Sequence, residues 1–241
     1  MRLLLGTILF LFCFSSNSRA QYAIVETIFS LNYNQEYDSA QALLQQQHTQ
    51  INPVYFAVLD IDGNYWKNVT GTNKPNYNAF EAVLEKYDPV NAGSEEEKTI
   101  RLITLSYRLR YQLKRFQLIS AVSTRKQTVD LFDELKENVN TLSPEQQELF
   151  SLYAALIRYF DNYLKPFWVS DKKANMDEAI QNMEKLSNSD QIIVKTLSAY
   201  FVGKIYLKYE KNSPQAEPYF EWLSKTYPAN HKFREYLQEA R

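Results

Sequence analysis

Glycine is scarce in this sequence, and this scarcity limits what the chain can fold into. Only five glycines occur in 241 residues, well below the usual share of about 7%. Phosphate-binding loops, Rossmann turns, nucleophile elbows and glycine-rich β-turns all need glycine where the backbone takes a positive φ. The composition therefore predicts an all-α fold and disfavours these site classes.

Residues 1–20 have the pattern of a secretory signal peptide. One basic residue precedes an apolar run from Leu3 to Phe14, which is too short to span a bilayer, and Ser18 and Ala20 are small residues at a cleavage site. Lipidation at Cys13 is a weaker alternative, because bulky residues precede it. We expect export to the periplasm or cell envelope, with cleavage near Ala20.

The expected mature chain, residues 21–241, is a single domain without cysteine, since Cys13 is the only one in the sequence. Disulfides are therefore excluded from it. It carries 25 basic and 28 acidic side chains, a net charge of −3. This balance argues against a nucleic-acid partner. No second apolar run reaches transmembrane length, and the oligomeric state stays open.

Apolar residues recur at helical spacing along most of the mature chain. One helix face is predicted by Leu102, Leu105, Leu109, Leu113 and Phe116. Ser143 followed by Pro144 predicts a helix start, and Asn175 is expected to cap a later helix. Helices are also expected over residues 22–32, 37–47 and 190–211. Antiparallel helix pairs with short turns recur, which calls for a repeat test.

The last helix pair matches the tetratricopeptide (TPR) pattern of small and aromatic residues. Gly203 and Tyr206 take the first-helix positions, and the second helix supplies Ala216, Phe220, Leu223 and the closing Pro228. Small residues let two helix axes approach, and aromatic rings fill the remaining gap. Ala40 and Ala179 take the equivalent position in two weaker units.

The segments "FDNYLKPFW", "KANMDEAIQNMEKLS" and "YFVGKIYLKYEKNSPQAEPYFEWLSKTYPANHKFREYL" resemble the C-terminal part of exported TPR-like proteins of Bacteroidetes-type bacteria. The resemblance is firm over about the last 75 residues. It implies an all-α, right-handed array of antiparallel helical hairpins with a C-terminal capping helix. It also implies no shared catalytic residues.

The stretch "DIDGNYWKN", from Asp60 to Asn68, resembles a calcium-binding loop. An EF-hand needs ligands at positions 1, 3 and 5, glycine at 6 and glutamate at 12. Neither register of this stretch satisfies that pattern. We therefore expect no metal site here, and predict that Asp62-Gly63-Asn64 forms a turn between helices.

Side chains for catalysis are few. His48 and His231 are the only histidines, so neither a zinc site nor a serine–histidine triad is supported. The acidic run Glu95–Glu97 follows Ser94, as expected at a helix N-terminus. No catalytic residue, metal or cofactor is predicted, although an active site of two carboxylates stays open.

The first candidate binding surface is a basic stripe. No acidic residue occurs from Lys98 to Val129, and Arg101, Arg108 and Arg115 recur every seven residues, with Tyr111 and Lys114 nearby. This stripe is a candidate for binding an acidic partner. The alternative is a solvated helix face whose charges pair with acids elsewhere in the fold.

A second candidate follows from the resemblance, because the first helix of a TPR unit lines the inner groove. In the last unit Tyr200, Lys204 and Lys208 are spaced by four residues and present an aromatic platform and two donors. The alternative is that the two lysines extend along the helix surface to keep their charges in water, with Tyr200 half-buried.

The sequence-based hypothesis for function is a non-enzymatic protein-interaction module that binds a protein or peptide in the cell envelope. The alternative is a glycan- or nutrient-binding accessory protein that uses exposed aromatic residues, among them Trp66, Trp168 and Trp222. A third hypothesis is a helical hydrolase that uses two carboxylates.

Overall fold

The computed structural model describes residues 21–71, 73–88 and 92–241. Within these ranges every regular element is a helix, and no strand occurs. This confirms the all-α prediction. The expected signal peptide lies outside the described residues. No helix among the described residues is both long and apolar enough to cross a membrane.

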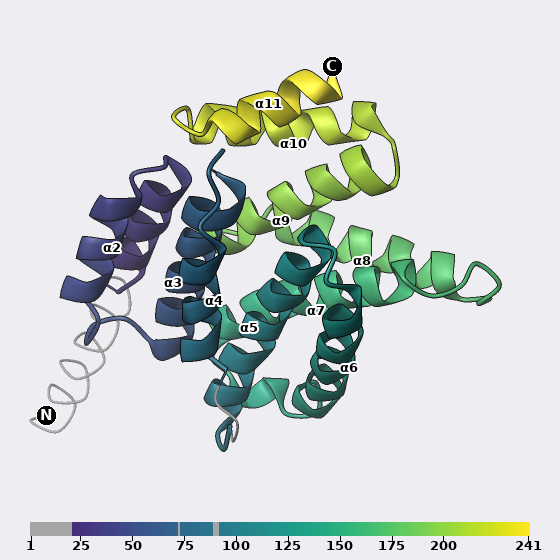
Figure 1. Ribbon diagram of the computed structural model, residues 1–241, viewed down its shortest axis with the longest axis horizontal. Coiled ribbons are helices and arrows are strands. Elements are labelled where there is room, and N and C mark those ends of the chain that lie inside the picture. Colours follow the sequence, from purple (N-terminus) through teal and green to yellow (C-terminus); the bar gives the residue numbers. More distant parts are fainter. Residues whose placement is uncertain (1–20, 72, 89–91) are drawn as a thin grey trace, which may run out of the picture.

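Eleven α-helices lie in the described ranges (Figure 1). The first covers residues 21–33. The others are α2 (Tyr37–Gln46), α3 (Pro53–Tyr65), α4 (Tyr77–Lys86), α5 (Glu95–Lys114), α6 (Leu118–Leu135), α7 (Pro144–Tyr163), α8 (Lys172–Leu186), α9 (Ile192–Lys204), α10 (Ser213–Thr226) and α11 (His231–Ala240). A 3₁₀ turn, η2 (Val139–Thr141), precedes α7, and π-helical turns η1 (Trp66–Thr70) and η3 (Ile205–Tyr209) extend α3 and α9.

The helix starts show how the local sequence sets these elements. Ser143 and Gln146 form a reciprocal capping box at the start of α7, with Pro144 in the first turn. Ser94 and Glu97 form a second box at the start of α5. One predicted cap is wrong: α8 begins at Lys172, so Asn175 lies in its first turn, where it accepts a hydrogen bond from Arg158.

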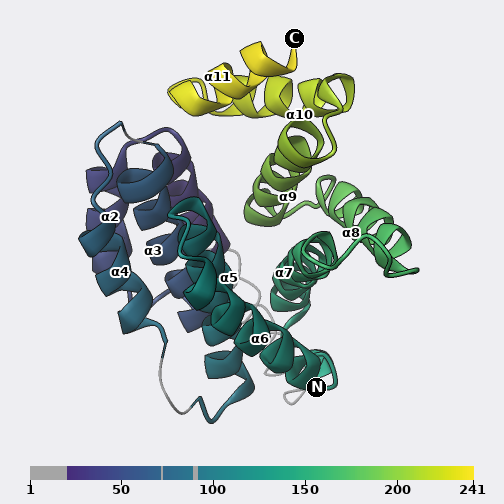
Figure 2. The same cartoon turned by 45° about the vertical axis from the view of Figure 1, so that its right-hand side comes forward.

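The helices follow one another as packed neighbours around a centre. Hairpins α5–α6, α7–α8 and α9–α10 each pack closely, and α11 packs against α10. Figure 2 shows α2 to α5 on one side, α7 to α9 on the other, and α10 and α11 across the top.

The first and the last helix of the described chain meet. Asn230, which caps α11, donates its side-chain N–H to the carbonyl oxygen of Tyr33 over 2.9 Å. Tyr33 also lies in an aromatic cluster with Trp66, Tyr227 and Phe233, at ring-centroid distances of 5.2 to 5.9 Å. Buried aromatic contacts of this kind stabilise beyond their area. The cluster closes the helices into a ring, so α11 packs against the first helices as well as the last hairpin.

The predicted repeat positions of the last hairpin are packed. A Cβ added at Gly203 would lie 3.0 Å from the Phe220 ring, so the glycine permits the close approach of α9 and α10. Tyr206 stacks on Tyr219, and Pro228 lies in the turn before α11. The remaining repeat positions are fully buried: Ala40, Ala179, Ala216 and Leu223.

The prediction of a turn at Asp62-Gly63-Asn64 is wrong. These residues lie inside α3, and no glycine in the described part of the chain has a positive φ. Gly63 is instead needed for packing, because an added Cβ would meet the side chain of Asn32 at 2.5 Å. Asp60 and Asp62 are both buried, and no group of three or more metal-ligating side chains occurs among the described residues.

Candidate functional site

The three arginines of the predicted basic stripe lie on one face of α5, and their charges are paired within the fold. Lys114, which was predicted beside them, lies on the opposite face. Arg101 and Arg108 both contact the carboxylate of Asp88, at 3.1 and 3.0 Å. Arg115 contacts Glu81 at 3.2 Å, and the buried Tyr111 donates to the same carboxylate at 2.5 Å. This is the alternative considered from the sequence. Because these three guanidinium groups already have carboxylate partners, they are less available to an external ligand. A binding role for the stripe stays a prediction.

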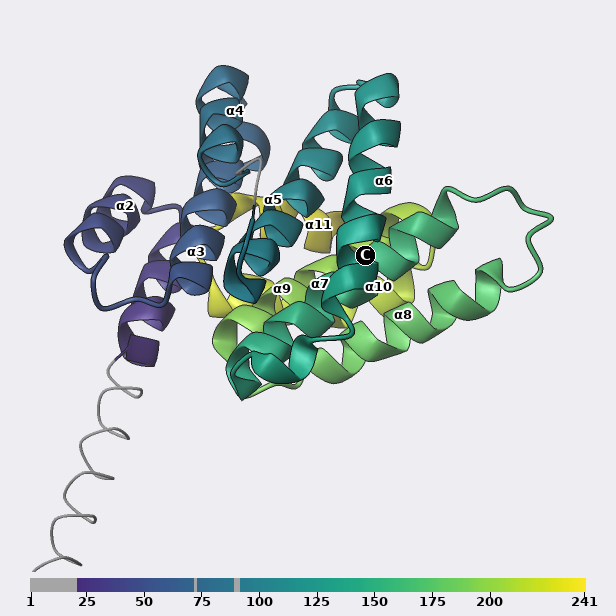
Figure 3. The same cartoon turned by 90° about the horizontal axis from the view of Figure 1, so that it is seen from below.

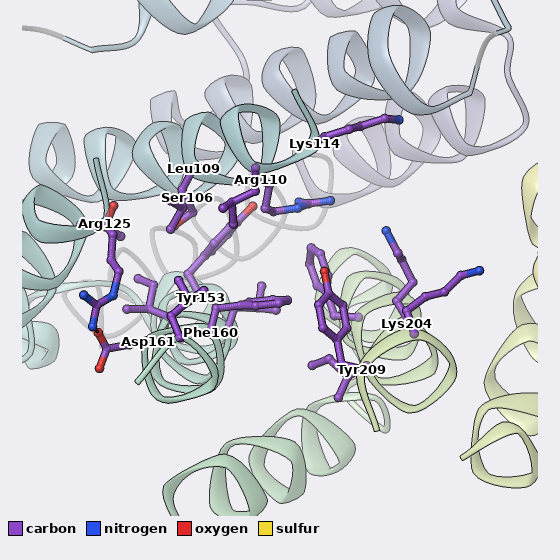
Figure 4. Close-up of a pocket in the computed structure, with 18 of the residues that line it drawn as sticks. Ser106, Leu109, Arg110, Lys114, Arg125, Tyr153, Phe160, Asp161, Lys204 and Tyr209 are labelled. Atoms are coloured by element: carbon purple, nitrogen blue, oxygen red, sulfur yellow. Dashed lines mark hydrogen bonds and ion pairs between the residues drawn. The ribbon is translucent and has the colours of Figure 1, made fainter. Parts of the chain in front are cut away.

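The opposite face of α5 has a different environment. Arg110 and Lys114 line a cavity of about 430 Å³ at the centre of the ring. The size lies in the range of small-molecule sites. Figure 4 shows side chains from α5, α7 and α9 facing this space. Both π-helical turns also contribute, through Thr70 of η1 and Tyr209 of η3. Such turns are frequent at functional sites.

Arg110 lies inside a cage of aromatic rings. Its guanidinium carbon lies 4.7 Å from the centroid of Tyr65, 4.9 Å from that of Tyr107 and 4.6 Å from that of Phe201. These cation–π contacts fix the orientation of the guanidinium group. Among the described residues no carboxylate forms an ion pair with it. No hydrogen bond occupies its N–H groups among the described residues either, so the guanidinium can donate to an acceptor in the cavity.

Two of the three predicted groove residues reach the same cavity. Lys204 and Lys208 line it, whereas Tyr200 is buried beneath and is not an exposed platform. The ammonium of Lys204 lies 5.3 Å from the Tyr200 ring and 5.9 Å from that of Tyr236. Lys208 is in an ion pair with Glu239. Within the described chain, Lys204 has no carboxylate partner.

The lining is strongly basic for a near-neutral protein. It contains five cationic side chains, namely Arg110, Lys114, Arg125, Lys204 and Lys208, but only one carboxylate. That carboxylate, Asp161, is in ion pairs with Arg125 and with Lys165. In Figure 4 this pair lies at one end of the cavity and Lys204 at the other, with Phe160 between.

The pKa shifts of Tyr65 and Lys114 indicate that the cations of the lining lie close enough together to influence the same groups. Burial opposes the change, but the positive charges of Arg110, Lys204 and Lys114 lower the pKa of the Tyr65 hydroxyl. Burial and the repulsion of Lys204, Lys232 and Arg110 lower the pKa of Lys114. One end of the cavity is therefore a concentrated positive pole.

Behind Arg110 lies a buried carboxyl group, that of Asp62. Tyr107 donates a hydrogen bond of 2.5 Å to its Oδ1, while its Oδ2 has no partner among the described residues. Burial raises the pKa of Asp62 to about 6, although the Tyr107 hydrogen bond and the charge of Arg110 act in the opposite direction. Below about pH 6 Asp62 is therefore mostly protonated and compensates little of the charge of Arg110, whereas near neutral pH it is mostly ionised.

A second unusual surface is the α5–α6 tip, which we define as Phe116, Leu118, Ile119 and Val122. All four are exposed, Phe116 to 84% and Ile119 to 92%. Figure 3 shows the turn between α5 and α6 at an outer edge of the molecule. Phe116 has φ 57°, a left-handed conformation that is costly for a bulky residue. The backbone thus places an aromatic ring in solvent.

The sequence indicated the acid-free segment that contains these features, but not the residues that matter. Arg110 was one cation among eight, and only its cage of rings from α3, α5 and α9 distinguishes it. Phe116 was expected on an apolar helix face. A turn over Arg115 and Phe116 ends the helix there instead.

No family model matches the chain, no curated protein matches it, and no solved structure matches it. The resemblance to TPR-like proteins therefore stays a prediction that rests on the sequence pattern.

Proposed function

We propose that this protein is a non-enzymatic interaction module of the periplasm or cell envelope, built as a TPR-like array of helical hairpins. Consecutive packed hairpins and the Gly203–Phe220 contact support the array. The apolar run of residues 3–14 supports export.

The docking surface in this proposal is the α5–α6 tip, and the observation that carries it is Phe116. A left-handed, solvent-exposed phenylalanine gains nothing from packing, and such strain concentrates at functional positions. Three further exposed apolar side chains follow it within two turns of helix. An aromatic centre with a polar rim is the usual anatomy of a binding surface.

The expected occupant is an acidic and apolar segment of a partner protein. The tip lies within the segment of residues 98–129 that contains no acidic side chain, and the exposed Lys126 follows it. Leu118 and Val122 share a helix face with Arg125 and Val129, which line the cavity. This face runs from the tip to the rim of a hollow, and an extended polypeptide can follow the helix to that rim whereas a flat bilayer cannot.

A site-specific crosslinking experiment tests this proposal. We expect a photoreactive amino acid at Ile119 to yield one dominant crosslinked protein in the cell envelope, through an acidic and apolar segment. The same amino acid at Ser151, which is exposed on α7, is the matched control and yields none. Phe116→Ser in the Ile119 background removes at least about nine tenths of the product, the effect of losing a central interface residue.

Two outcomes contradict the proposal. One is equal crosslinking from the Ile119 and Ser151 positions. The other is flotation of the wild-type protein, but not of Phe116→Ser, with anionic phospholipid vesicles, which would make the tip a membrane anchor.

A second candidate, glycan binding, is favoured by one pair of rings. Phe167 and Trp168 lie in the turn before α8, exposed to 87% and 73%, with their centroids 5.1 Å apart. Trp66 is buried and Trp222 is half-buried beside Lys195, so Trp168 is the exposed tryptophan of the described chain. Quenching of its fluorescence by oligosaccharides, and the loss of this response in Trp168→Ala, would support this function.

A further inference from the structure

The central cavity is not used by the docking surface proposed above, and its chemistry specifies a ligand of its own. Its walls combine a large apolar area with a few cations. The apolar part comes from α5, α6, α7 and α9, through Leu109, Val129, Leu156, Ile157, Phe160 and Phe201. The positive pole lies where α5 and α9 face each other, at Arg110, Lys114 and Lys204.

The polar groups of the lining are mostly hydrogen-bond donors. Within the described ranges Arg110 and Lys204 donate to no carboxylate, and Lys114 makes one hydrogen bond of 2.8 Å, to the carbonyl oxygen of Val69. Tyr153, a residue only 1% exposed, lines the cavity, and its buried hydroxyl has no hydrogen-bond partner in the described chain. A buried polar group without a partner is costly, and Arg110, Lys114 and Lys204 also have no carboxylate partner among these residues, so the cavity wall is short of hydrogen-bond acceptors.

This imbalance distinguishes between classes of ligand. A polypeptide would bring backbone N–H groups that need acceptors, yet the one lining carboxylate, Asp161, is already in two ion pairs. A neutral sugar would bring many hydroxyl donors to walls that are largely apolar. A molecule whose polar atoms only accept hydrogen bonds satisfies both the donors and the apolar walls.

We infer that the cavity binds a small amphiphilic anion, with a carboxylate or phosphate head at Arg110, Lys114 and Lys204 and an unbranched apolar body along Leu109, Ile157 and Phe160. Figure 4 shows Arg110, Lys114 and Lys204 toward one side and Phe160 toward the middle of the cavity. The planar guanidinium matches the two oxygens of either head group.

The aromatic cage explains why Arg110 is the anchor. A long side chain normally loses conformational freedom when it binds, but three rings already hold this guanidinium in place. The anion therefore meets a preorganised donor, which raises affinity. Lys114 and Lys204 add charge from two other directions, and the anion relieves their mutual repulsion.

Calorimetric titration of the mature chain with decanoate, below the concentration at which it forms micelles, tests the inference. We expect saturable binding with one site. Decyl phosphate is the second arm: whichever of the two binds more tightly identifies the head group. Acetate, which lacks the apolar body, and decanol, which lacks the charge, are expected to bind at least about tenfold more weakly.

Two arginines on the same helix give matched variants. Arg110→Gln is expected to weaken decanoate binding at least about tenfold, whereas Arg108→Gln, which changes an arginine paired with Asp88 on the opposite face, leaves it unchanged. If Arg110→Gln fails to fold, Lys204→Gln replaces it, because this side chain is at the edge of the cage. Phe116→Ser leaves decanoate binding unchanged, so failure here is separable from failure of the proposed docking surface.

Three results would each overturn the inference. If decanol binds as tightly as decanoate, the cavity binds apolar molecules and the cations do not contribute to affinity. An equal loss in Arg108→Gln and Arg110→Gln would show a general effect of charge. If the wild-type protein binds neither decyl anion, the cavity is not a site for amphiphilic anions.

Discussion

The two faces of α5 have the same kind of side chain and opposite surroundings. On the outer face Arg101, Arg108 and Arg115 lie against Asp88 and Glu81. On the inner face Arg110 and Lys114 face the cavity without a carboxylate partner in the described chain. Arg108 and Arg110 are two positions apart in the sequence, which corresponds to a rotation of about 200° around the helix axis.

This difference teaches how to separate structural from functional charge. Ion pairs hold α5 against α4, through Glu81, and against Asp88, which follows α4 in the chain. The arginine charges on this face are therefore neutralised within the fold. Cations that stay unpaired in a partly desolvated cavity oppose folding, so the folded protein keeps them at a cost. We therefore assign stability to the outer face and ligand binding to the inner face.

The largest expected effect on stability concerns Asp62, a buried residue of α3 whose carboxyl group interacts electrostatically with Arg110 of the inner face. The folded-state pKa is about 6 and the ordinary value is near 4, so between these two pH values the group is protonated in the folded protein and ionised in the unfolded chain. Folding thus binds a proton between about pH 4 and 6, and the free energy of unfolding falls as pH rises through that window, by roughly 3 kcal/mol in total. Asp62→Asn removes this loss and raises stability near pH 7.

Urea denaturation between pH 4 and 8 measures this effect, and Asp60→Asn is the matched control. Asp60 accepts hydrogen bonds from Lys86 and Tyr87, both of 2.8 Å. Its replacement is expected to lower stability and to keep the pH dependence set by Asp62. A wild-type stability that is flat from pH 4 to 6 would contradict the prediction.

The sequence predicted those parts of the fold that depend on neighbours in the chain. Ser143 and Pro144 specify a helix start through their own backbone and side-chain geometry. The Gly203–Phe220 contact joins adjacent helices of one hairpin, so its residues recur at a fixed spacing. Such features are local, and a pattern in one sequence is enough to find them.

The parts that were missed depend on residues far apart in the chain. Gly63 looked like a turn residue because its partner, Asn32, lies in another helix and leaves no local pattern. The hydrogen bond from Asn230 to Tyr33 joins residues 197 positions apart. Likewise, Arg101 and Arg110 differ only in which acids and rings the fold brings to them.

A smaller effect is expected on the outer face, from Asp88→Asn. This change removes the shared partner of Arg101 and Arg108 and leaves two half-buried guanidinium groups close together. We expect a loss of about 1–2 kcal/mol in the free energy of unfolding, since the groups are partly exposed and solvent screens them. Thermal denaturation at low salt measures it. No change in stability would show that the stripe is a solvated surface and free to bind.

The smallest effect on stability is expected from Lys204→Gln on the inner face. Lys204 has no carboxylate partner in the described chain, and its charge repels that of Lys114, whose pKa is lowered by burial and by this repulsion. Replacement therefore loses the contacts with the Tyr200 and Tyr236 rings but relieves repulsion, and the free energy of unfolding should change by less than about 0.5 kcal/mol. Urea denaturation beside Asp88→Asn gives the direct comparison. A loss as large as that of Asp88→Asn would mean that the inner face also serves stability, and the division between the two faces of α5 would fail.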